Sequence, residues 1–294
     1  MKISTINRQQ TGFFSQQQLD MSYNQAVYAD FLAQPFSPEA FKTQIQRKKA
    51  TFSDEKRDQL VQALKKQYTG VEIHTTVAAN IELLANPNTF TVVTGHQMVA
   101  MTGPLYFIYK ILHVIKLSED LNNTFPNEHF VPVYWMASED HDFEEIRSFL
   151  LFGQKWTWES SQKGAVGQFD TNDLQPLLQA LAEKFQNQAE SEIHHLIEKF
   201  KTPNYGSGFF EFVNELFSVY GLVIIDADNP QLKQSAWPIW EKDLYTNDIH
   251  NAVIDQTQAL KDQGRNTPIE SKESNLFILD IGKRERIEKT GQIQ

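Results

Sequence analysis

The sequence predicts an α/β fold with a parallel sheet, and two segments in the middle of the chain carry this prediction. Residues 89–121 (TFTVVTGHQMVAMTGPLYFIYKILHVIKLSEDL) and 129–146 (HFVPVYWMASEDHDFEEI) each start with a short apolar run, which gives way to polar residues and then to helical periodicity. Strand-like runs that alternate with helical patterns are typical of βαβ units. Because open α/β sheets bind ligands at the carboxyl ends of their strands, we expect the two polar groups to meet in one crevice.

Residues 23–84 precede the first strand and are predicted to be mainly helical. The clearest helix begins after Ser53, a favourable N-cap residue that acidic residues follow, and ends at Gly70. Its apolar face is formed by side chains at helical spacing, namely Leu60, Val61 and Leu64. A second helix at residues 76–84 then leads into the sheet.

The first strand is predicted at residues 90–93, which are uncharged and rich in β-branched side chains, as in a strand buried on both faces. A loop at residues 95–103 follows, and Pro104 is predicted to begin the next helix. That helix is expected to bury Leu105, Ile108, Ile111, Leu112 and Ile115. The second strand, at residues 130–136, completes a βαβ unit in which Pro132 is tolerated near the strand's start.

The chain is predicted to have three parts. Residues 1–148 combine the helical approach with the first half of a sheet core. Residues 149–204 have a different pattern: aromatic strand-like pieces precede two predicted helical runs, at residues 174–185 and 189–201, so we interpret this part as an insertion. Residues 205–294 return to the sheet pattern.

The third part contains one clear strand, GLVIIDAD, which ends in Asp226 and Asp228. Helices are predicted at residues 208–220, 231–247 and 250–263, and a further strand at 275–280, which a turn at Gly282 follows. A doubly wound sheet normally has more strands than these. We therefore expect this chain to be the N-terminal part of a longer protein.

Composition excludes several classes of function. The 294 residues carry a net charge of −10, so the basic surface that binds nucleic acid is not expected. The chain has no cysteine, which excludes disulfides, thiolate zinc sites and a cysteine nucleophile. The Gln-rich start has no apolar signal-peptide core, and no apolar run reaches the length of a membrane span. We expect a cytoplasmic protein that does not bind membranes.

The first candidate group is Thr94-Gly95-His96-Gln97, directly after the first strand. Glycine lets a ligand approach the backbone, and the imidazole and amide side chains can bind phosphate or carboxylate. The alternative is an ordinary βα loop in which the histidine is satisfied internally.

The next helix adds further candidates. If Thr102 and Gly103 open this helix, their free amides and the positive end of its dipole favour an anion; simple capping is the alternative. Lys110 can turn back toward the site or lie on a solvated face, which is the simpler prediction. Tyr106, on this helix, and Trp135, on the second strand, complete the predicted binding residues.

The second candidate group is Ser138-Glu139-Asp140-His141-Asp142. Three carboxylates and an imidazole repel or compete with one another unless a cation joins them, such as a metal ion or an ammonium group. Magnesium carried by a nucleotide is the natural metal candidate, although these residues alone define no protein metal site. The alternative is helix capping, for which Asp142 is best placed before Phe143.

Other features predict less. His194 and His195 are adjacent on a predicted helix and cannot share one face of it, which disfavours a metal pair. Asp226 and Asp228 can face the crevice or form a turn. The sequence contains no Walker motif, dinucleotide fingerprint, GxSxG elbow or HExxH motif.

Taken in order, five segments resemble one family, that of the bacillithiol biosynthesis protein BshC. They are TGHQ, TGPLYFIYK, PVYWMASEDHDFEEI, YGLVIIDADNP and NLFILDIGKRERI. The resemblance implies an α/β fold with a Rossmann-like core similar to class I aminoacyl-tRNA synthetases. It also implies a connective-peptide insertion, which matches residues 149–204, and a C-terminal coiled coil that mediates homodimerisation and is absent from this chain. The family commonly has Gly-Gln-Gln where this chain has Gly95-His96-Gln97.

The implied activity is a cysteine ligase that joins the carboxyl group of cysteine to the amino group of glucosaminyl malate, with ATP as the expected activator. Residues 94–97 and the Thr102-Gly103 helix start would then hold phosphate or the malate carboxylates. Glu139, Asp140 and His141 would bind the incoming ammonium group or deprotonate it. Two alternatives stay open: a nucleotidyltransferase-like enzyme that activates another acid, and a non-catalytic nucleotide-binding or scaffold protein.

Overall fold

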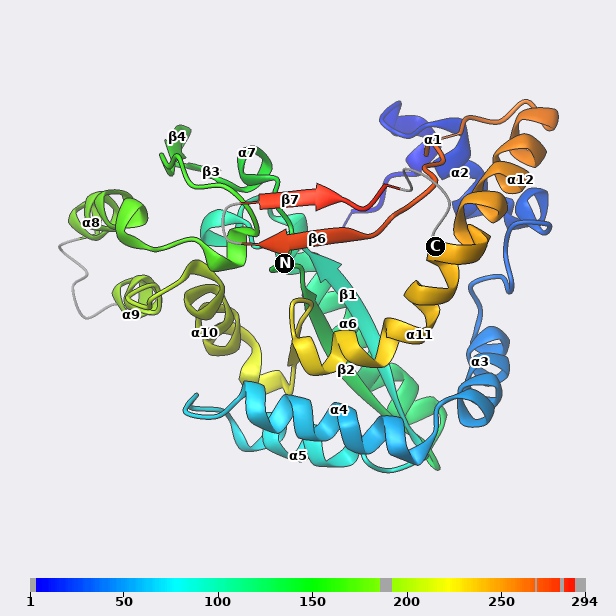
Figure 1. Cartoon of the computed structure of the whole chain (residues 1–294), viewed down its shortest axis with the longest axis horizontal. Helices are drawn as coiled ribbons and strands as arrows, with labels where there is room; N and C mark the ends of the chain where they lie inside the picture. The colour runs from blue at the N-terminus through cyan, green and yellow to red at the C-terminus, as the bar shows by residue number, and fades with distance from the viewer. Residues whose placement is uncertain (1–3, 186–191, 268, 281–282, 289–294) are drawn as a thin grey trace. The chain divides into compact units, whose positions relative to one another are not determined.

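The computed structural model describes residues 4–185, 192–267, 269–280 and 283–288 (Figure 1). The chain divides into two compact units. One comprises residues 1–51, 241–275 and 288–294, and the other comprises residues 52–240 and 276–287. Each is described by itself below, and the candidate site lies within the larger unit.

The larger unit contains a parallel sheet of three strands in the order β1-β2-β5. These strands are β1 (Thr89–His96), β2 (His129–Met136) and β5 (Val223–Asp226). The register pairs His96 with Met136 and Met136 with Asp226, so all three strands end in one row. The arrowheads of β1 and β2 accordingly point the same way in Figure 1. The sequence-based prediction of a parallel α/β core is confirmed.

The predicted βαβ unit consists of β1, α6 (Tyr106–Thr124) and β2. Pro132 lies in β2, the central strand, but pairing with β5 begins only at Val133, so the proline precedes that part of the ladder. The prediction that β1 is buried on both faces is wrong. Exposed residues alternate with better buried ones along β1, so one face of the strand is open, and Val93 on that face is 51% exposed.

Helix α6 begins at Tyr106 rather than at Pro104. Its buried face is Phe107, Ile111, Val114, Ile115, Ser118 and Leu121. The predicted burial of Leu105 and Leu112 is wrong: Leu105 precedes the helix and is 64% exposed, and Leu112 lies on its outer side and is 39% exposed. The buried stripe is therefore rotated from the predicted one toward Phe107 and Val114.

Two helices precede the sheet as predicted, α4 (Asp54–Gln67) and α5 (Thr75–Leu83). The Ser53 side chain caps α4 by accepting a hydrogen bond from the backbone N–H of Lys56. Arg57 on α4 is 4% exposed, and its guanidinium donates to the carbonyls of Leu84, Thr89 and Pro87 at 3.0–3.2 Å. One buried cation thus joins α4 to the turn that leads into β1.

The segment between β2 and β5 is held by an aromatic cluster. Trp158 is fully buried and packs against Phe143, Phe169 and Tyr205 with ring centroids 4.8–6.1 Å apart. The elements of this segment are α7 (Phe143–Ile146), β3 (Ser148–Leu151), β4 (Gln154–Thr157), η3 (Val166–Gln168), η4 (Asn172–Leu174), α8 (Gln175–Lys184), α9 (Glu192–Glu198), α10 (Tyr205–Phe217) and η6 (Ser218–Tyr220). Strands β3 and β4 form an antiparallel hairpin. The predicted helical run at 189–201 starts outside the described residues and is seen as α9. The domain boundaries at 149 and 204 stay a prediction.

The C-terminal elements are α11 (Pro230–Thr246), α12 (Asp248–Asp262), β6 (Phe277–Asp280) and β7 (Lys283–Arg286). The helices confirm the predicted runs within one or two residues. Strands β6 and β7 pair antiparallel as a separate hairpin, and their predicted Gly282 turn lies outside the described residues.

The smaller unit contains α1 (Arg8–Thr11), α2 (Gln16–Tyr23), η1 (Gln25–Tyr28), α3 (Pro38–Thr51) and α12. The guanidinium of Arg265 lies 4.0 Å from the centroid of the Tyr28 ring and donates to the carbonyl of Val27 at 3.0 Å. This cation–π contact joins the segment after α12 to the N-terminal helices.

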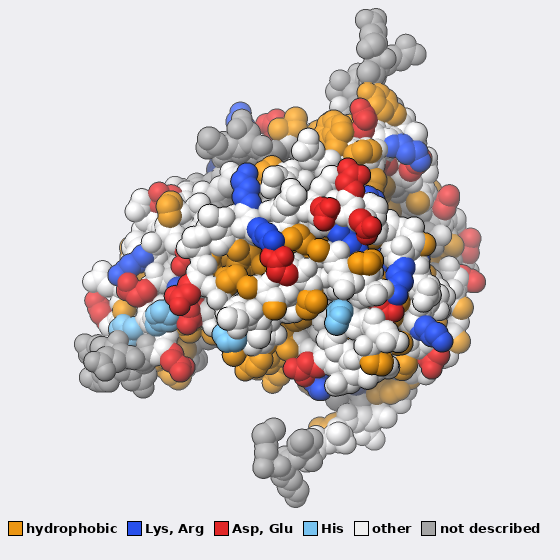
Figure 2. Space-filling view, turned by 90° about the horizontal axis from the view of Figure 1, so that it is seen from below, with side chains coloured by type: hydrophobic (Ala, Val, Ile, Leu, Met, Phe, Trp, Pro, Cys, Tyr) orange, Lys and Arg blue, Asp and Glu red, His pale blue; other side chains and the backbone are white. Residues whose placement is uncertain are grey.

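Two further properties of the described residues concern helix length and surface charge. Within the described residues, no helix is long and apolar enough to cross a bilayer. On the face shown in Figure 2, acidic and basic side chains are interspersed with apolar ones rather than gathered into one basic area. That distribution differs from the basic stripe typical of nucleic-acid binding proteins.

Replacing Arg57 with methionine is expected to lower the free energy of unfolding by roughly 2–4 kcal/mol, because three buried or half-buried carbonyls lose their donors together. Urea unfolding followed by circular dichroism measures the change. Lys56→Met, at an exposed position next to it on α4, is the matched control and should stay within about 0.5 kcal/mol of the parent. Equal unfolding midpoints for the two variants would contradict this account of Arg57.

Candidate functional site

The two predicted polar groups meet at the row of strand ends. The backbone N–H of Ala137 donates to the carbonyl of His96 at 3.2 Å, and Tyr134 Oη donates to the same carbonyl at 2.9 Å. Gln97 Nε2 donates to Asp140 Oδ2 at 2.8 Å and to Glu145 Oε2 at 2.9 Å. The prediction that the two polar groups lie side by side is therefore confirmed, and a glutamine amide bridges two carboxylates between them.

His96 is held in one tautomer. Its Nδ1 lies 3.0 Å from the carbonyl oxygen of Gln97, which only accepts, so Nδ1 carries the proton and Nε2 keeps a free lone pair. Burial lowers the pKa of His96, and Lys110 adds to this, whereas the hydrogen bond to Gln97 opposes it. The ring also packs against Tyr106 and Phe107. His96 is therefore a neutral acceptor near pH 7.

The rest of the first group lines the end of β1. Thr94 and Gly95 lie in the strand itself, and a Cβ at Gly95 would lie 3.6 Å from the side chain of Trp135. Trp135 and Tyr106 are large apolar side chains that are 41% and 55% exposed. Lys110 Nζ donates to the carbonyl of Gly95, so the prediction that it lies on a solvated face is wrong. One cationic group is thus fixed at the end of β1.

The prediction that Thr102 and Gly103 open helix α6 is wrong. Met101 and Thr102 have positive φ values of 46° and 67°, Gly103 has a φ of 46°, and the helix begins three residues later. The N–H of Gly103 already donates to the carbonyl of Ala100 at 2.8 Å. A Cβ at Gly103 would lie 2.7 Å from Val99 Cβ, so close packing explains this glycine better than anion binding does.

Asp140 is the best-bonded carboxylate of the second group. Its Oδ1 accepts hydrogen bonds from the backbone N–H groups of His141 and Asp142 at 2.7 and 3.2 Å, and its Oδ2 accepts from Gln97. Burial raises the pKa of Asp140, but the hydrogen bonds from Gln97, Asp142 and His141 outweigh burial, and the net pKa is lowered. Asp140 is therefore ionised at neutral pH.

The flanking residues orient this loop. Asp142 accepts a hydrogen bond from the N–H of Glu145 and caps α7, as predicted. His141 Nδ1 lies 3.4 Å from Asp140 Oδ1, and His141 Nε2 lies 3.3 Å from a guanidinium nitrogen of Arg284 on β7. The imidazole thus lies between a carboxylate and a cation.

Glu139 differs from its neighbours because one of its oxygens has no partner. Oε2 is buried and accepts no hydrogen bond from any described residue. Burial raises the pKa of Glu139, and repulsion from Asp140 and Asp228 adds to this, while its own backbone N–H and Lys233 oppose it. A half-buried carboxyl group with a raised pKa is suited to accept a proton from a substrate.

The sequence analysis left open whether Asp226 and Asp228 face the crevice or form a turn. The structure places both beside the second group. Ser138 Oγ donates to Asp226 Oδ1, and Asp228 forms an ion pair with Lys233 and accepts from Gln168 Nε2 at 3.2 Å. Gln67 of α4 accepts from the N–H of Asp226 at 3.0 Å and donates to the carbonyl of Ile224 at 2.9 Å. The sequence analysis missed Gln67, Gln168 and Lys233. Only the fold brings them to the site, and no local pattern in the sequence indicates it.

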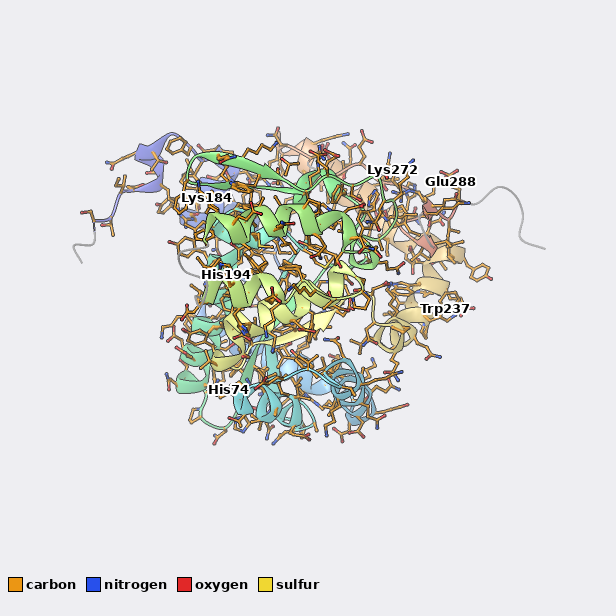
Figure 3. The ribbon with its side chains drawn as sticks, turned by 90° about the vertical axis from the view of Figure 1, so that its left-hand side faces the viewer. His74, Lys184, His194, Trp237, Lys272 and Glu288 are labelled. Carbon is orange, nitrogen blue, oxygen red and sulfur yellow. The ribbon has the colours of Figure 1, made fainter. Side chains whose placement is uncertain are left out.

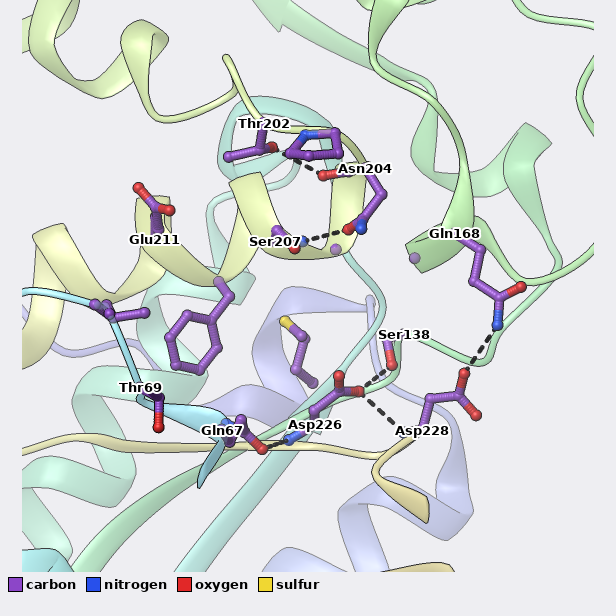
Figure 4. A pocket seen from close by; sticks show the side chains of 17 residues that line it. Gln67, Thr69, Ser138, Gln168, Thr202, Asn204, Ser207, Glu211, Asp226 and Asp228 are labelled. Atoms are coloured by element: carbon purple, nitrogen blue, oxygen red, sulfur yellow. Dashed lines mark hydrogen bonds between the residues drawn. The ribbon is translucent and has the colours of Figure 1, made fainter. Parts of the chain in front are cut away.

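A pocket of about 510 Å³ opens beside these residues (Figure 4). Its floor is formed by Met136, Ser138 and Asp226 at the ends of β2 and β5. Two glycines allow its walls to approach: a Cβ at Gly167 would lie 2.8 Å from Ser138, and a Cβ at Gly206 would lie 2.8 Å from the carbonyl of Gly167. Backbone packing therefore fixes the shape of the pocket.

The described residues do not fit a protein-held metal ion. No group of three His, Asp or Glu side chains among them is arranged to hold one. The Asp140 oxygens are already occupied by three N–H donors. His194 of α9, labelled in Figure 3, interacts with the carbonyl of Phe185 at 3.2 Å, whereas His195 pairs with Glu215, so the adjacent histidines have separate partners.

The parallel sheet and the side chains at its strand ends define an open α/β protein of the Rossmann-like class. Comparison with known families agrees: residues 1–294 match the model described as "Bacillithiol biosynthesis BshC, N-terminal Rossmann-like domain". The chain therefore belongs to the BshC family.

Three of the relatives named "Putative cysteine ligase BshC" illustrate the similarity. Those of Flavobacterium johnsoniae and Flavobacterium psychrophilum are each 38% identical to this chain, and each match covers 98% of the chain and 54% of the relative. That of Christiangramia forsetii is 34% identical, with 98% and 55% covered. The chain thus spans about half the length of these relatives.

Replacing Gln97 with alanine should destabilise the larger unit by roughly 1–3 kcal/mol at pH 7, because a hydrogen bond to a charged carboxylate is lost. A lowered pKa contributes stability above the unfolded value of about 3.9 and loses it as pH falls through the folded value. The difference from the parent should therefore shrink between pH 7 and pH 3 in urea titrations. Gln154→Ala, at an exposed position, is the control; a difference independent of pH would contradict the assignment to Asp140.

Replacing Glu139 with glutamine should raise stability at pH 7. The raised pKa means that the unfolded chain ionises before the folded one as pH rises above the ordinary 4.5, so the parent loses stability there and the amide does not. Thermal unfolding at pH 7 and pH 4 should show a gain at the higher pH only. A glutamine variant that is less stable at pH 7 would show that the carboxylate has an ionic partner.

Proposed function

We propose that this chain forms the Rossmann-like part of a ligase that joins the carboxyl group of cysteine to the amino group of glucosaminyl malate in bacillithiol biosynthesis. Family membership and the names of the relatives support the proposal. The structural observation that carries it is the unpaired, buried oxygen of Glu139 beside the fixed Asp140 at the ends of parallel strands.

The reaction places two demands on such a site. An amine attacks a carbonyl carbon only in its neutral form, so a proton must leave the ammonium group. The carboxyl carbon of cysteine must also carry a better leaving group than hydroxide. As the C–N bond forms and the C–O bond breaks, the proton of the amine passes to a base and the oxygen departs with the activating group. The enzyme needs a base and a place for anions.

Glu139 is the proposed base. Its pKa is raised, and therefore lies closer to pH 7 than that of an ordinary carboxyl group. Its free oxygen can accept a proton without first breaking a hydrogen bond. Asp140 stays ionised and, through Gln97, fixes the two turns relative to one another. His141 would contact the substrate amine from its place between Asp140 and Arg284.

The end of β1 is the proposed anion side. Lys110 supplies a positive charge at the carbonyl of Gly95, and Thr94 and Gly95 leave the strand end open to an approaching ligand. His96 and Gln97 border the same place, with Trp135 and Tyr106 as exposed apolar surfaces beside it. ATP, when bound, supplies the activation of the cysteine carboxyl, and Lys110 would neutralise part of its charge or that of the malate carboxylates.

Magnesium has no step in this proposal, because the described carboxylates do not form a site for it without a substrate. Metal ions that accompany nucleotides are held largely by phosphates and water, with one or two protein carboxylates. We also propose, from the family resemblance, that the intact protein is a homodimer.

The test uses the intact protein with cysteine, glucosaminyl malate and ATP, and follows the cysteinyl product by mass spectrometry. Glu139→Gln should reduce the rate by roughly 10²-fold or more, the size of a general-base contribution. In the parent, the rate should fall as pH drops through the raised pKa of Glu139, and this acidic limb should be missing in the residual activity of the variant. Glu55→Gln, at an exposed position on α4, should keep the parental rate and pH profile.

Each other result changes the proposal in a defined way. Product formed without ATP would keep the assignment of the joining reaction and remove ATP from it. Full activity of Glu139→Gln would move the base elsewhere. A folded protein that forms no product under any condition, but binds ATP, would favour a non-catalytic nucleotide-binding protein.

A further inference from the structure

The pocket at the ends of β2 and β5 is separate from the anion side at the end of β1. Its volume of about 510 Å³ lies within the range of small-molecule sites, roughly 300–1,000 Å³. It opens at the carboxyl ends of parallel strands, where open α/β sheets bind ligands. Figure 4 shows Asp226 at its floor, with Asn204 and Ser207 on the opposite wall. No role assigned above uses this space.

The lining is rich in hydroxyl and amide groups from separate segments. They are Ser138, Ser207, Thr69, Thr202, Gln67 and Asn204. Phe210 and Met136 add apolar surface. Alternating polar and apolar groups of this kind suit a ligand that carries several hydroxyl groups on a compact ring. The many short polar side chains distinguish the pocket from a site for an apolar molecule.

The charges of the lining select a cation. Carboxylates line the pocket at Glu211, Asp226 and Asp228, and none of its lining residues is lysine or arginine. Lys233 neutralises Asp228 from outside the lining. Asp226 uses only Oδ1 for its bonds to Ser138 and to the N–H of Asp228, which leaves Oδ2 without a described partner. Glu211 is half-buried and also has no described partner. Two carboxylates therefore remain uncompensated.

The N-terminus of α10 also borders the pocket and would favour an anion, with about half a positive charge. Most of its free amides are already used. Tyr205 N donates to the carbonyl of Phe169, Ser207 N to Asn204 Oδ1 and Gly208 N to the carbonyl of Asn204. Two carboxylates outweigh this helix end, so a phosphate is disfavoured and an ammonium group is favoured.

The pocket is also placed for the proposed reaction. Ser138 lines it, and Glu139 is the next residue along the chain. An amine held at Asp226 would therefore lie beside Ser138, which donates to Asp226 and directly precedes the proposed base. The contacts of Gly167 and Gly206 fix this geometry before any ligand binds.

We propose that this pocket is the acceptor site and binds the amino sugar of glucosaminyl malate. Its ammonium group would lie at Asp226, in a lining that Glu211 makes more negative, and its hydroxyl groups on the serine and amide side chains. This assignment rests on the proposed function. Cysteine also carries an ammonium group, but it has no ring hydroxyls to use the polar lining and would fill little of the space. The pocket thus assigns the two amine-bearing substrates to different places.

The test measures KM for each substrate in the intact protein, together with calorimetric binding of methyl glucosaminide. Asp226→Asn keeps an acceptor oxygen for Ser138 and Asp228 and removes only the charge. Glu211→Gln removes a charge that has no partner to lose. Each should raise KM for glucosaminyl malate and the Kd of methyl glucosaminide by roughly tenfold, with KM for cysteine unchanged. Asp58→Asn, at an exposed position on α4, is the control and should change neither constant.

Two further probes separate charge from shape. Methyl N-acetylglucosaminide retains the ring and loses the cation, so it should bind the parent at least about tenfold more weakly than methyl glucosaminide. If the variants form product with an unchanged KM for glucosaminyl malate, the assignment of this pocket as the acceptor site is wrong, while the proposed ligase activity stands. A rise in KM for cysteine alone would assign the pocket to the amino acid and also overturn it. If the protein binds methyl glucosaminide in a way that depends on both carboxylates but forms no product, the pocket assignment is supported and the proposed ligase activity is contradicted.

Discussion

The common register of three parallel strands is the constraint on which the site depends. Because β1, β2 and β5 run the same way and end at His96, Met136 and Asp226, each following loop starts at one edge of the sheet. Side chains that are far apart in sequence are then close enough in space to form hydrogen bonds. Gln97 spans from the first loop to Asp140 in the second, and Ser138 spans from the second to Asp226 in the third. These two bonds join the three strand ends into one row.

Within this row the carboxylates have different environments, and the difference suggests different tasks. Asp140 accepts three N–H donors and keeps its charge, whereas Glu139, one residue earlier, is buried with an oxygen that no described group satisfies. A buried polar atom without a partner reduces stability. Such an arrangement is typical of groups that act on a ligand, because the missing partner is what a substrate supplies. The same loop thus contains a residue suited to holding structure and one suited to chemistry.

Local signals in the sequence were sufficient for much of this architecture. Ser53 as a cap, the apolar runs of β1, β2 and β5, and the capping role of Asp142 each depend on neighbours along the chain. Features that depend on distant elements were not predictable. The exposure of Val93 follows from the uncovered face of β1, and the late start of α6 follows from the positive φ values of Met101 and Thr102. Gln67 and Lys233 reach the site from helices whose place in the fold no periodicity reveals. The proximity of Gln97 and Asp140 was predictable, because parallel neighbouring strands bring the loops that follow them together.

The raised pKa of Glu139 has a thermodynamic consequence for binding experiments. A cation that binds beside this carboxyl group favours its ionised form, so binding near the pKa releases a proton into solution. The buffer takes up that proton with its own heat of ionisation. The enthalpy measured for an ammonium-bearing ligand then depends on the buffer chosen, while that for a neutral ligand of the same shape does not. Calorimetry in two buffers of different ionisation enthalpy therefore counts the protons that the site exchanges with solution.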